Sequence, residues 1–168
     1  MVQFEAERVL LVLDSLSAAG LWFAVDGGWG VDALAGRQTR EHEDLDGVVL
    51  LDDAEALLEA VARLGFVLDL DLRPTRFVAK HADGAWVDFH PLVFDADGVG
   101  WQLGAKAGGG DAPYPANGFT SGSIGGRSIA CLTAGLQLVH HEGYEPDAKD
   151  AADLRVLAEL MGREEGAP

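Results

Sequence analysis

The chain has 168 residues, of which 28 are acidic and 12 are basic, and its formal net charge is −16. A surface of that charge repels nucleic-acid phosphates and anionic membranes, so we expect neither as a partner. It would attract a cationic small molecule, although ordinary soluble proteins are often acidic too. Hydrophobic residues make up 48% of the sequence, which excludes disorder over most of the chain.

The sequence also bounds the location of the protein. A single cysteine, Cys131, excludes an internal disulfide. No apolar run approaches the ~18 residues that a membrane-spanning helix needs. The first apolar segment is preceded by Glu5 and Glu7 and not by basic residues, so we expect no signal peptide and predict a cytoplasmic protein.

The first half of the chain alternates between helix and strand patterns. Apolar residues recur at helical spacing over residues 4–19 and 54–64, and a glycine follows each of these predicted helices. A shorter amphipathic segment, residues 29–34, predicts a helix that stops at Gly36. The predicted strands are residues 21–25, 44–51, 66–70, 76–80 and 85–93, and a turn at 82–84 joins the last two.

The second half predicts a short strand at 101–103 and an irregular loop at 104–118, which is rich in glycine and contains two prolines. Residues 119–132 alternate around a glycine pair and predict a hairpin. Thr133 can cap a helix over 134–141, a last helix covers 147–161, and residues 162–168 are expected to fray. These patterns predict a mixed α+β fold in one domain, residues 1–168. A twisted mixed sheet is flanked by helices, and a helical part follows at about 133–161.

Most of the candidate functional residues lie in the segment 25–49. Gly27 and Gly28 follow a predicted strand, and a helix that starts there directs its N–H groups toward an anion. Asp44 and Asp46 are two positions apart in a strand, so they project from one face, roughly 7 Å apart at their backbones. Such carboxylates repel unless a cation lies between them, and Mg²⁺ binds carboxylates together with phosphate oxygens. The segment therefore predicts a site for a nucleoside triphosphate and its metal ions.

Two further segments add candidate residues. Arg40 and His42 lie in the loop before the acidic pair, and we predict that they contact the triphosphate; a solvated loop is the alternative. In the predicted strand 85–93, Asp88 shares one face with Trp86 and His90. Asp88 is suited to bind a metal or to accept a proton from an attacking hydroxyl, and a solubilising edge acid is the alternative. His90 can contact Asp88 or the acceptor, or serve only the structure.

Taken in order, these motifs resemble those of the small antibiotic nucleotidyltransferases. That group comprises the lincosamide nucleotidyltransferases and the aminoglycoside 2''-adenylyltransferases, within the superfamily of DNA polymerase beta. The resemblance spans residues 21–160 and rests on Gly27-Gly28-Trp29, Val31-Asp32-Ala33-Leu34, Gly36-Arg37, Thr39-Arg40, His42, Asp44-Leu45-Asp46, Val87-Asp88-Phe89-His90-Pro91, His141-Glu142-Gly143-Tyr144-Glu145 and Lys149-Asp150. Gly30 and Gly47 depart from the family pattern, and a glycine at position 47 would loosen the strand that carries the acidic pair.

The resemblance implies an enzyme that moves a nucleoside monophosphate, AMP from ATP, onto a hydroxyl of a small molecule and releases pyrophosphate. The acceptor would be an aminoglycoside or a lincosamide. Two Mg²⁺ ions would be held by Asp44, Asp46 and Asp88. The nucleotide would be bound by Gly27, Gly28, Arg40, His42 and Lys149. The acceptor would be bound by His90, Glu142 and Tyr144.

Two alternatives stay open at this point. One is a nucleotidyltransferase that modifies a protein or a metabolite, as a toxin-type enzyme does, and the other is a non-catalytic nucleotide-binding protein on the same scaffold. Only residues 132–168 follow Cys131, which leaves little chain for an acceptor pocket. We therefore expect a homodimer in which a second subunit completes that pocket.

Overall fold

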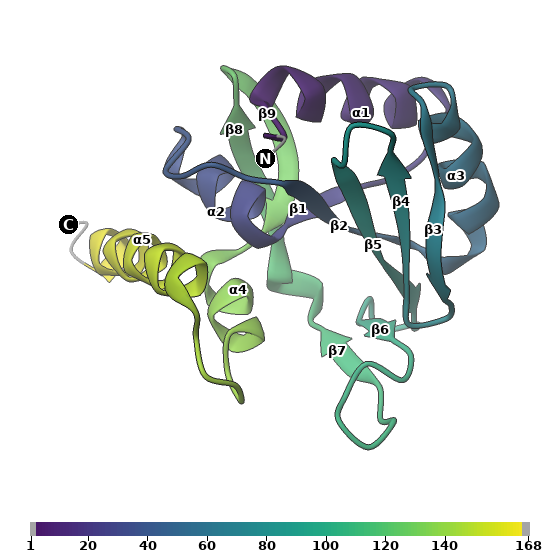
Figure 1. The fold of residues 1–168 in the computed structure, drawn as a ribbon. Helices are drawn as coiled ribbons and strands as arrows, with labels where there is room; N and C mark the ends of the chain where they lie inside the picture. Colours follow the sequence, from purple (N-terminus) through teal and green to yellow (C-terminus); the bar gives the residue numbers. More distant parts are fainter. Residues whose placement is uncertain (1–2, 166–168) are drawn as a thin grey trace.

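The computed structural model describes residues 3–165, and a mixed sheet forms its centre (Figure 1). The strand order is β3-β4-β5-β2-β1-β9-β8, and β6 and β7 extend from β5 as a separate arm. The strands are β1 Ala24–Asp26, β2 Asp44–Leu50, β3 Phe66–Leu72, β4 Arg76–His81, β5 Trp86–Phe94, β6 Gly100–Gln102, β7 Ala112–Tyr114, β8 Phe119–Ile124 and β9 Arg127–Leu132. The helices are α1 Ala6–Ala18, α2 Gly27–Ala35, α3 Ala54–Ala62, α4 Ala134–His140 and α5 Ala148–Glu165, with 3₁₀ turns at Leu51–Asp53 and Ala116–Gly118. The predicted mixed α+β fold is confirmed.

The register of the central strands prepares the site. Strand β2 pairs antiparallel with β1 on one side and parallel with β5 on the other. Asp46 lies opposite Asp26 of β1 and opposite Asp88 of β5, so three aspartates stand in a row across three adjacent strands. Because side chains alternate along a strand, Asp44 and Val48 point to the same side as Asp46.

Each side of β2 packs into its own core. Leu45 and Val49 are fully buried in the larger cluster, to which α1, α2 and α3 contribute. Val48 points the other way and packs in a second cluster with Tyr114 of the β6–β7 arm and Leu136 of α4. The rigid middle of β2 therefore carries its acidic N-terminal end at a fixed place on the sheet.

The last two helices lie beside α2, on the side of the molecule away from β3 (Figure 1). The Thr133 side chain caps α4 by accepting a hydrogen bond from the N–H of Leu136. Leu157 of α5 is fully buried against Val31 of α2. Within residues 3–165, no helix is both long enough and apolar enough to cross a bilayer.

The predictions for two segments are wrong. The predicted irregular loop at 104–118 contains strand β7 and a 3₁₀ turn, because β7 pairs with β6 and the Tyr114 hydroxyl donates to Gln102 at 3.0 Å. Helix α5 continues through Gly162 to Glu165, where fraying was predicted, and the remaining residues of that prediction, 166–168, lie outside the described part.

The two glycines that depart from the family pattern are both sites of close packing. A Cβ at Gly47 would lie 1.9 Å from the Phe23 ring, and one at Gly30 would lie 2.5 Å from the Gln137 amide. Gly47 lies in the middle of β2, which is paired on both edges. The glycine therefore makes room for the Phe23 ring, and the expected loosening of the strand is countered by packing.

We predict that Gly47→Ala lowers the free energy of unfolding by about 1–3 kcal/mol, the usual effect of overpacking a dense core. Urea titration of the variant would measure this change. Gly135→Ala is the matched control, because its Cβ would meet no atom within 4 Å and alanine favours the helix. Adding Phe23→Leu to Gly47→Ala should recover part of the loss, and a failure to recover any would contradict the assigned clash.

Candidate active site

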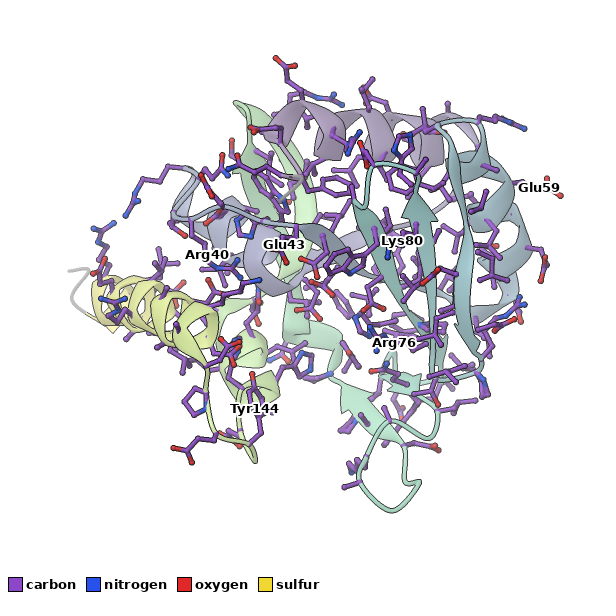
Figure 2. The ribbon with its side chains drawn as sticks, in the orientation of Figure 1. Arg40, Glu43, Glu59, Arg76, Lys80 and Tyr144 are labelled. Carbon is purple, nitrogen blue, oxygen red and sulfur yellow. The ribbon has the colours of Figure 1, made fainter. Side chains whose placement is uncertain are left out.

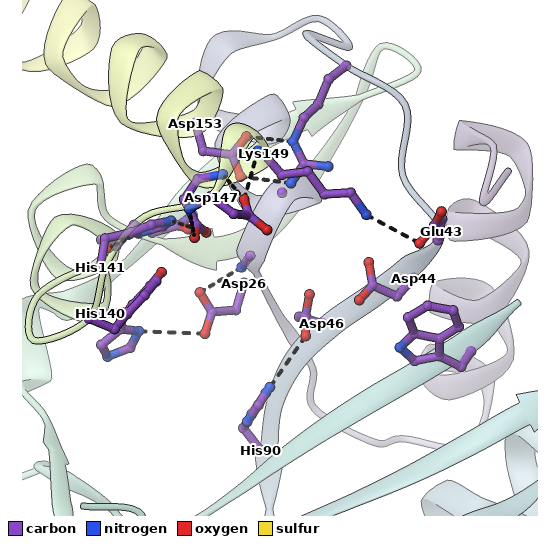
Figure 3. A pocket seen from close by; sticks show the side chains of 17 residues that line it. Asp26, Glu43, Asp44, Asp46, His90, His140, His141, Asp147, Lys149 and Asp153 are labelled. Carbon is purple, nitrogen blue, oxygen red and sulfur yellow. Dashed lines mark hydrogen bonds and ion pairs between the residues drawn. The ribbon is translucent and has the colours of Figure 1, made fainter. Parts of the chain in front are cut away.

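A pocket of about 410 Å³ opens between the acidic end of β2 and a wall formed by α4 and α5 (Figure 3). Gly27, Gly28, Asp44 and Asp46 line it from the sheet side. From the helical side come Gln137, His140, His141, Tyr144, Asp147, Lys149, Asp150 and Asp153. One wall of the pocket is thus formed by residues that are far from the glycine pair in the sequence.

Gly27 permits a close contact in the pocket. Its φ of +59° is strained for any other residue, and a Cβ there would lie 2.4 Å from Asp46 Oδ2. Its N–H donates to Asp26 Oδ1 at 2.7 Å, which starts helix α2. The Asp46 carboxylate therefore lies directly against the first turn of α2, which brings a candidate metal ligand next to a helix N-terminus that can bind an anion.

Asp88 is held by a residue that the sequence reasoning missed. Arg76 of β4 donates from Nε to both carboxylate oxygens, at 2.8 and 2.9 Å, and from Nη2 to Oδ2 at 2.6 Å. Asp88 is only 5% exposed, so this ion pair also compensates its burial. The predicted turn at 82–84 could have pointed to Arg76, because an antiparallel hairpin there brings Val78 opposite Asp88 and places Arg76 two positions further along, on the same face of the sheet.

His90 lies between the carboxylates and the β6–β7 arm. Its Nε2 is 3.5 Å from Asp46 and 3.8 Å from Asp88. Burial disfavours the charged imidazolium, but Asp46, Asp88 and Asp26 raise the pKa of His90 to about 9. Its Nδ1 lies 3.3 Å from Nε2 of Gln102, a β6 residue that the sequence reasoning also missed.

The acidic residues suit a divalent cation. Carboxylate oxygens of Asp46 and Asp88 lie within 4.8 Å of each other; a ring nitrogen of His90 lies equally close, but its raised pKa leaves it protonated, so only the carboxylates count as candidate ligands. Asp44 also lines the pocket, and burial first, and then the charges of Asp46 and Asp88, raise its pKa to about 7. A carboxylate destabilised in this way gains from a bound cation, so the residues present fit a hard metal ion with oxygen ligands.

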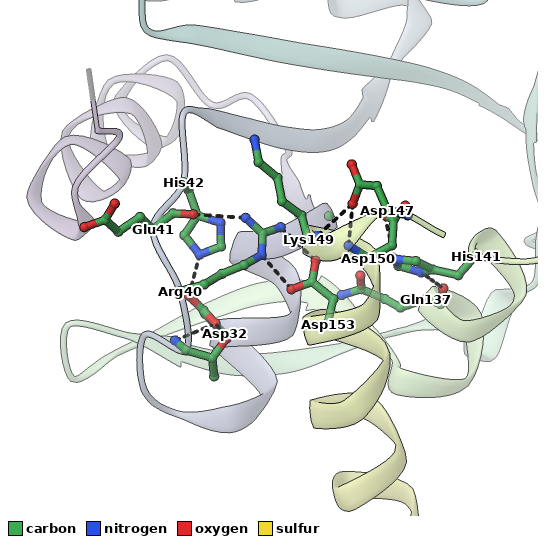
Figure 4. Close-up of polar contacts among 12 residues, drawn as sticks. Asp32, Arg40, Glu41, His42, Gln137, His141, Asp147, Lys149, Asp150 and Asp153 are labelled. Atoms are coloured by element: carbon green, nitrogen blue, oxygen red, sulfur yellow. Dashed lines mark hydrogen bonds and ion pairs between the residues drawn. The ribbon is translucent and has the colours of Figure 1, made fainter. Parts of the chain in front are cut away.

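The basic loop divides into one half-buried residue and one fully buried residue. The Arg40 side chain is 20% exposed and lines the pocket (Figure 4). The His42 side chain is fully buried, and its Nε2 bonds Asp32 at 2.6 Å. Its Nδ1 lies against Gly28, where a Cβ would be 2.5 Å away. The structure thus places His42 behind the glycine pair and outside the pocket lining, so any direct contact with nucleotide stays a prediction.

The predicted C-terminal site residues also divide. Tyr144 and Lys149 line the pocket, and Lys149 Nζ lies 3.2 Å from Glu43 on the opposite rim. Glu142 is exposed in the connection between α4 and α5 and is not among the lining residues. Figure 2 shows Arg40 and Tyr144 on the α5 side of the molecule and Arg76 on the β4 side.

A mixed sheet with neighbouring acidic strands, beside a helix that starts at a glycine pair, is the arrangement expected from the resemblance to the nucleotidyltransferases. Residues 8–157 match the aminoglycoside-2''-adenylyltransferase family, and the chain belongs to that family. A lincosamide resistance protein of Staphylococcus haemolyticus is 28% identical over 154 residues, 92% of this chain and 94% of that protein. The prediction of an enzyme of the antibiotic nucleotidyltransferase class is confirmed.

Solved structures show the same fold. The lincomycin-bound lincosamide adenylyltransferase LnuA is 26% identical, with a TM-score of 0.84 over 95% of this chain and 99% of that one. The structure of ANT(2'')-Ia in complex with adenylyl-2''-tobramycin is 22% identical, with a TM-score of 0.72 over 95% and 91%. The second likeness concerns the fold alone.

The acidic cluster should make the metal-free protein less stable as the pH rises. The folded-state pKa of Asp44 is raised from 3.8 to about 7, so its contribution is full below pH 3.8 and is lost as the pH rises through about 7. We expect Asp44→Asn to flatten the fall in melting temperature across this window. Thermal unfolding in EDTA at several pH values measures it, with Asp52→Asn, on an exposed turn, as control. Equal slopes for wild type and Asp44→Asn would contradict the assignment.

Proposed function

We propose that this protein transfers a nucleoside monophosphate, with ATP as donor, to a hydroxyl of an aminoglycoside or lincosamide antibiotic and releases pyrophosphate. The observation that carries the proposal is the contact between the Asp46 carboxylate and Gly27 at the start of α2, with Asp88 next to Asp46 in register. In a member of this family, this arrangement brings two candidate metal ligands, Asp44 and Asp46, and the N-terminus of α2 into one pocket, with the candidate base Asp88 buried directly behind the pocket lining.

The metal site is proposed from the same residues. Asp44, Asp46 and Asp88 would hold two Mg²⁺ ions, which when bound supply positive charge to the attacking and leaving oxygens. The raised pKa of Asp44 supports this, because crowded carboxylates are stabilised by such a charge. His90, positively charged between Asp46 and Asp88, would balance part of the same acidic charge from the sheet side.

The chain's own groups would act on the substrates as follows. The glycine pair would let the phosphates approach the start of α2, where the Gly28 N–H would bind them while the Gly27 N–H stays with Asp26, and Arg40 and Lys149 would lie over them. The acceptor oxygen attacks the α-phosphorus in line, a new O–P bond forms, and the bond to the pyrophosphate oxygen breaks. Asp88 would accept the hydroxyl proton, and Arg76 would orient its carboxylate for this step. His90 and Tyr144 would contact the acceptor from opposite sides of the pocket.

The surroundings of this reaction remain proposals. We propose that residues 1–168 form one domain, in which the helical part at 133–161 is one wall of the pocket. We further propose that the protein works in the cytoplasm as a homodimer, with neither nucleic acid nor a membrane as partner. The acidic surface supports the last point, since the formal net charge is −16.

Incubating the protein with each nucleoside triphosphate, MgCl₂ and a panel of antibiotics, followed by mass spectrometry, tests the proposal directly. We expect one acceptor to gain the mass of AMP with ATP as donor. Asp46→Asn should lose at least 10³-fold in rate while remaining folded, since it removes a metal ligand. Asp97→Asn, on an exposed turn, is the matched control. Transfer to no antibiotic, or an active Asp46→Asn variant, would sink the proposal.

The charge of the pocket leads to a prediction about the acceptor. Asp147, Asp150 and Glu43 line it beside the acidic pair, so an acceptor with several ammonium groups should be attracted. We expect competition between kanamycin and lincomycin to favour kanamycin at 0.05 M NaCl and to favour it less at 0.5 M, as screening grows. A preference for lincomycin that does not change with salt would contradict the charge argument and identify a lincosamide enzyme.

A further inference from the structure

The α5 wall of the pocket poses an electrostatic problem for the proposed function. Asp147, Asp150 and Asp153 all line the pocket from this wall, and carboxylates repel a triphosphate. Asp153 differs from the other two because it is only 2% exposed. Burying a carboxylate costs free energy unless it is paired, so its partner indicates what it does.

The partner of Asp153 is Arg40, which lies 113 positions earlier in the chain (Figure 4). Arg40 donates from Nε to Oδ1 and from Nη2 to Oδ2, both at 2.8 Å. This two-point contact fixes the plane of the guanidinium group, which a single contact would leave free to rotate. The helix α5 is thereby tied to the loop that leads into β2.

The remaining donors of Arg40 stay available for a ligand. A guanidinium group has five N–H donors, and Asp153 uses two of them. Nη1 donates one more to the carbonyl of Glu41 at 3.0 Å, which leaves two. Nη2 lies against the glycine pair, since a Cβ at Gly28 would come within 2.4 Å of it. The free edge of Arg40 is thus held at the place where the phosphates are proposed to bind.

We propose that Asp153 is a positioning residue of the nucleotide site, which holds Arg40 in place over Gly28 before the triphosphate arrives. The inference rests on the proposed function, because it takes the triphosphate as the ligand of the glycine pair. An arginine that is already ordered loses less conformational entropy when it binds phosphate, and this favours affinity. The negative charge of Asp153 acts in the opposite direction, so the two effects differ in sign.

That difference in sign makes the test sharp. If Asp153 acted only as a charge, Asp153→Asn would tighten ATP binding, because it removes an acid from the pocket. If Asp153 positions Arg40, the same change should weaken binding of ATP with MgCl₂ by roughly tenfold, because a neutral amide holds the guanidinium poorly. Calorimetry without an acceptor measures the affinity. Asp150→Asn is the matched control, since it removes the same charge from the same wall and should leave ATP affinity equal or tighter.

Three further measurements separate positioning from a general loss of structure. The effect of Asp153→Asn should be smaller for AMP than for ATP, because AMP lacks the β- and γ-phosphates. In an Arg40→Met background, Asp153→Asn should weaken ATP binding no further, since the residue acts through Arg40. If Asp153→Asn does not fold, Arg40→Lys carries the test, because lysine keeps the charge without the two-point contact and should weaken ATP more than AMP.

The outcomes distinguish this inference from the proposed function. A wild-type protein that does not bind ATP with MgCl₂ would overturn both. Wild-type binding together with unchanged or tighter binding by Asp153→Asn would overturn only the positioning role. Equal losses for ATP and AMP, or a further loss in the Arg40→Met background, would overturn it as well.

Discussion

The site depends on one unfavourable arrangement, the close approach of several carboxylates at the end of β2. Strand register places Asp26, Asp46 and Asp88 side by side, and Asp44 shares their side of the sheet. Burial and the like charges of Asp46 and Asp88 both raise the free energy of a charged Asp44 in the folded chain, and both raise its pKa. The pairing of β2 on both edges and the burial of Leu45 and Val49 hold the row in place. The positions of the aspartates are thus maintained by strand pairing and by the packing of buried side chains on the opposite face of β2.

Glycines, which have no side chain, are as important to this packing as the buried side chains. At Gly27 the space of a Cβ is taken by Asp46, at Gly28 by Arg40 and His42, and at Gly47 by Phe23. In each case a group from another part of the chain occupies the volume next to the backbone. The glycines therefore allow the start of α2, the acidic end of β2 and the loop with Arg40 and His42 to come within contact distance of one another.

The two walls of the pocket differ in their ion pairs. On the sheet side, Arg76 and His90 place positive charge next to Asp88 and Asp46. On the helical side, the buried Arg40–Asp153 pair and the exposed Lys149–Glu43 pair join α5 to the loop before β2. Arg40 and Lys149 are the two cations proposed to bind the triphosphate, so under that proposal nucleotide binding and the position of α5 are linked.

The sequence by itself determined the class of fold and the central motif. Alternation over residues 85–93, the glycine pair and the acidic pair are local patterns, and local patterns set strand faces, turns and helix starts. The same reading erred at residues 104–118. There the β6–β7 pairing and the bond between Tyr114 and Gln102 override a local composition that favours a loop.

Only the tertiary structure decided which side chains meet. It placed His42 behind Gly28, left Glu142 outside the pocket lining, and brought Gln102, Arg76 and Asp153 to the site. A predicted hairpin could have indicated Arg76. Asp153 could not be predicted in this way, because 113 positions separate it from Arg40 and a local sequence pattern does not relate residues so far apart. Such contacts depend on how whole elements pack, because the space left by one glycine is filled by residues far away in the chain.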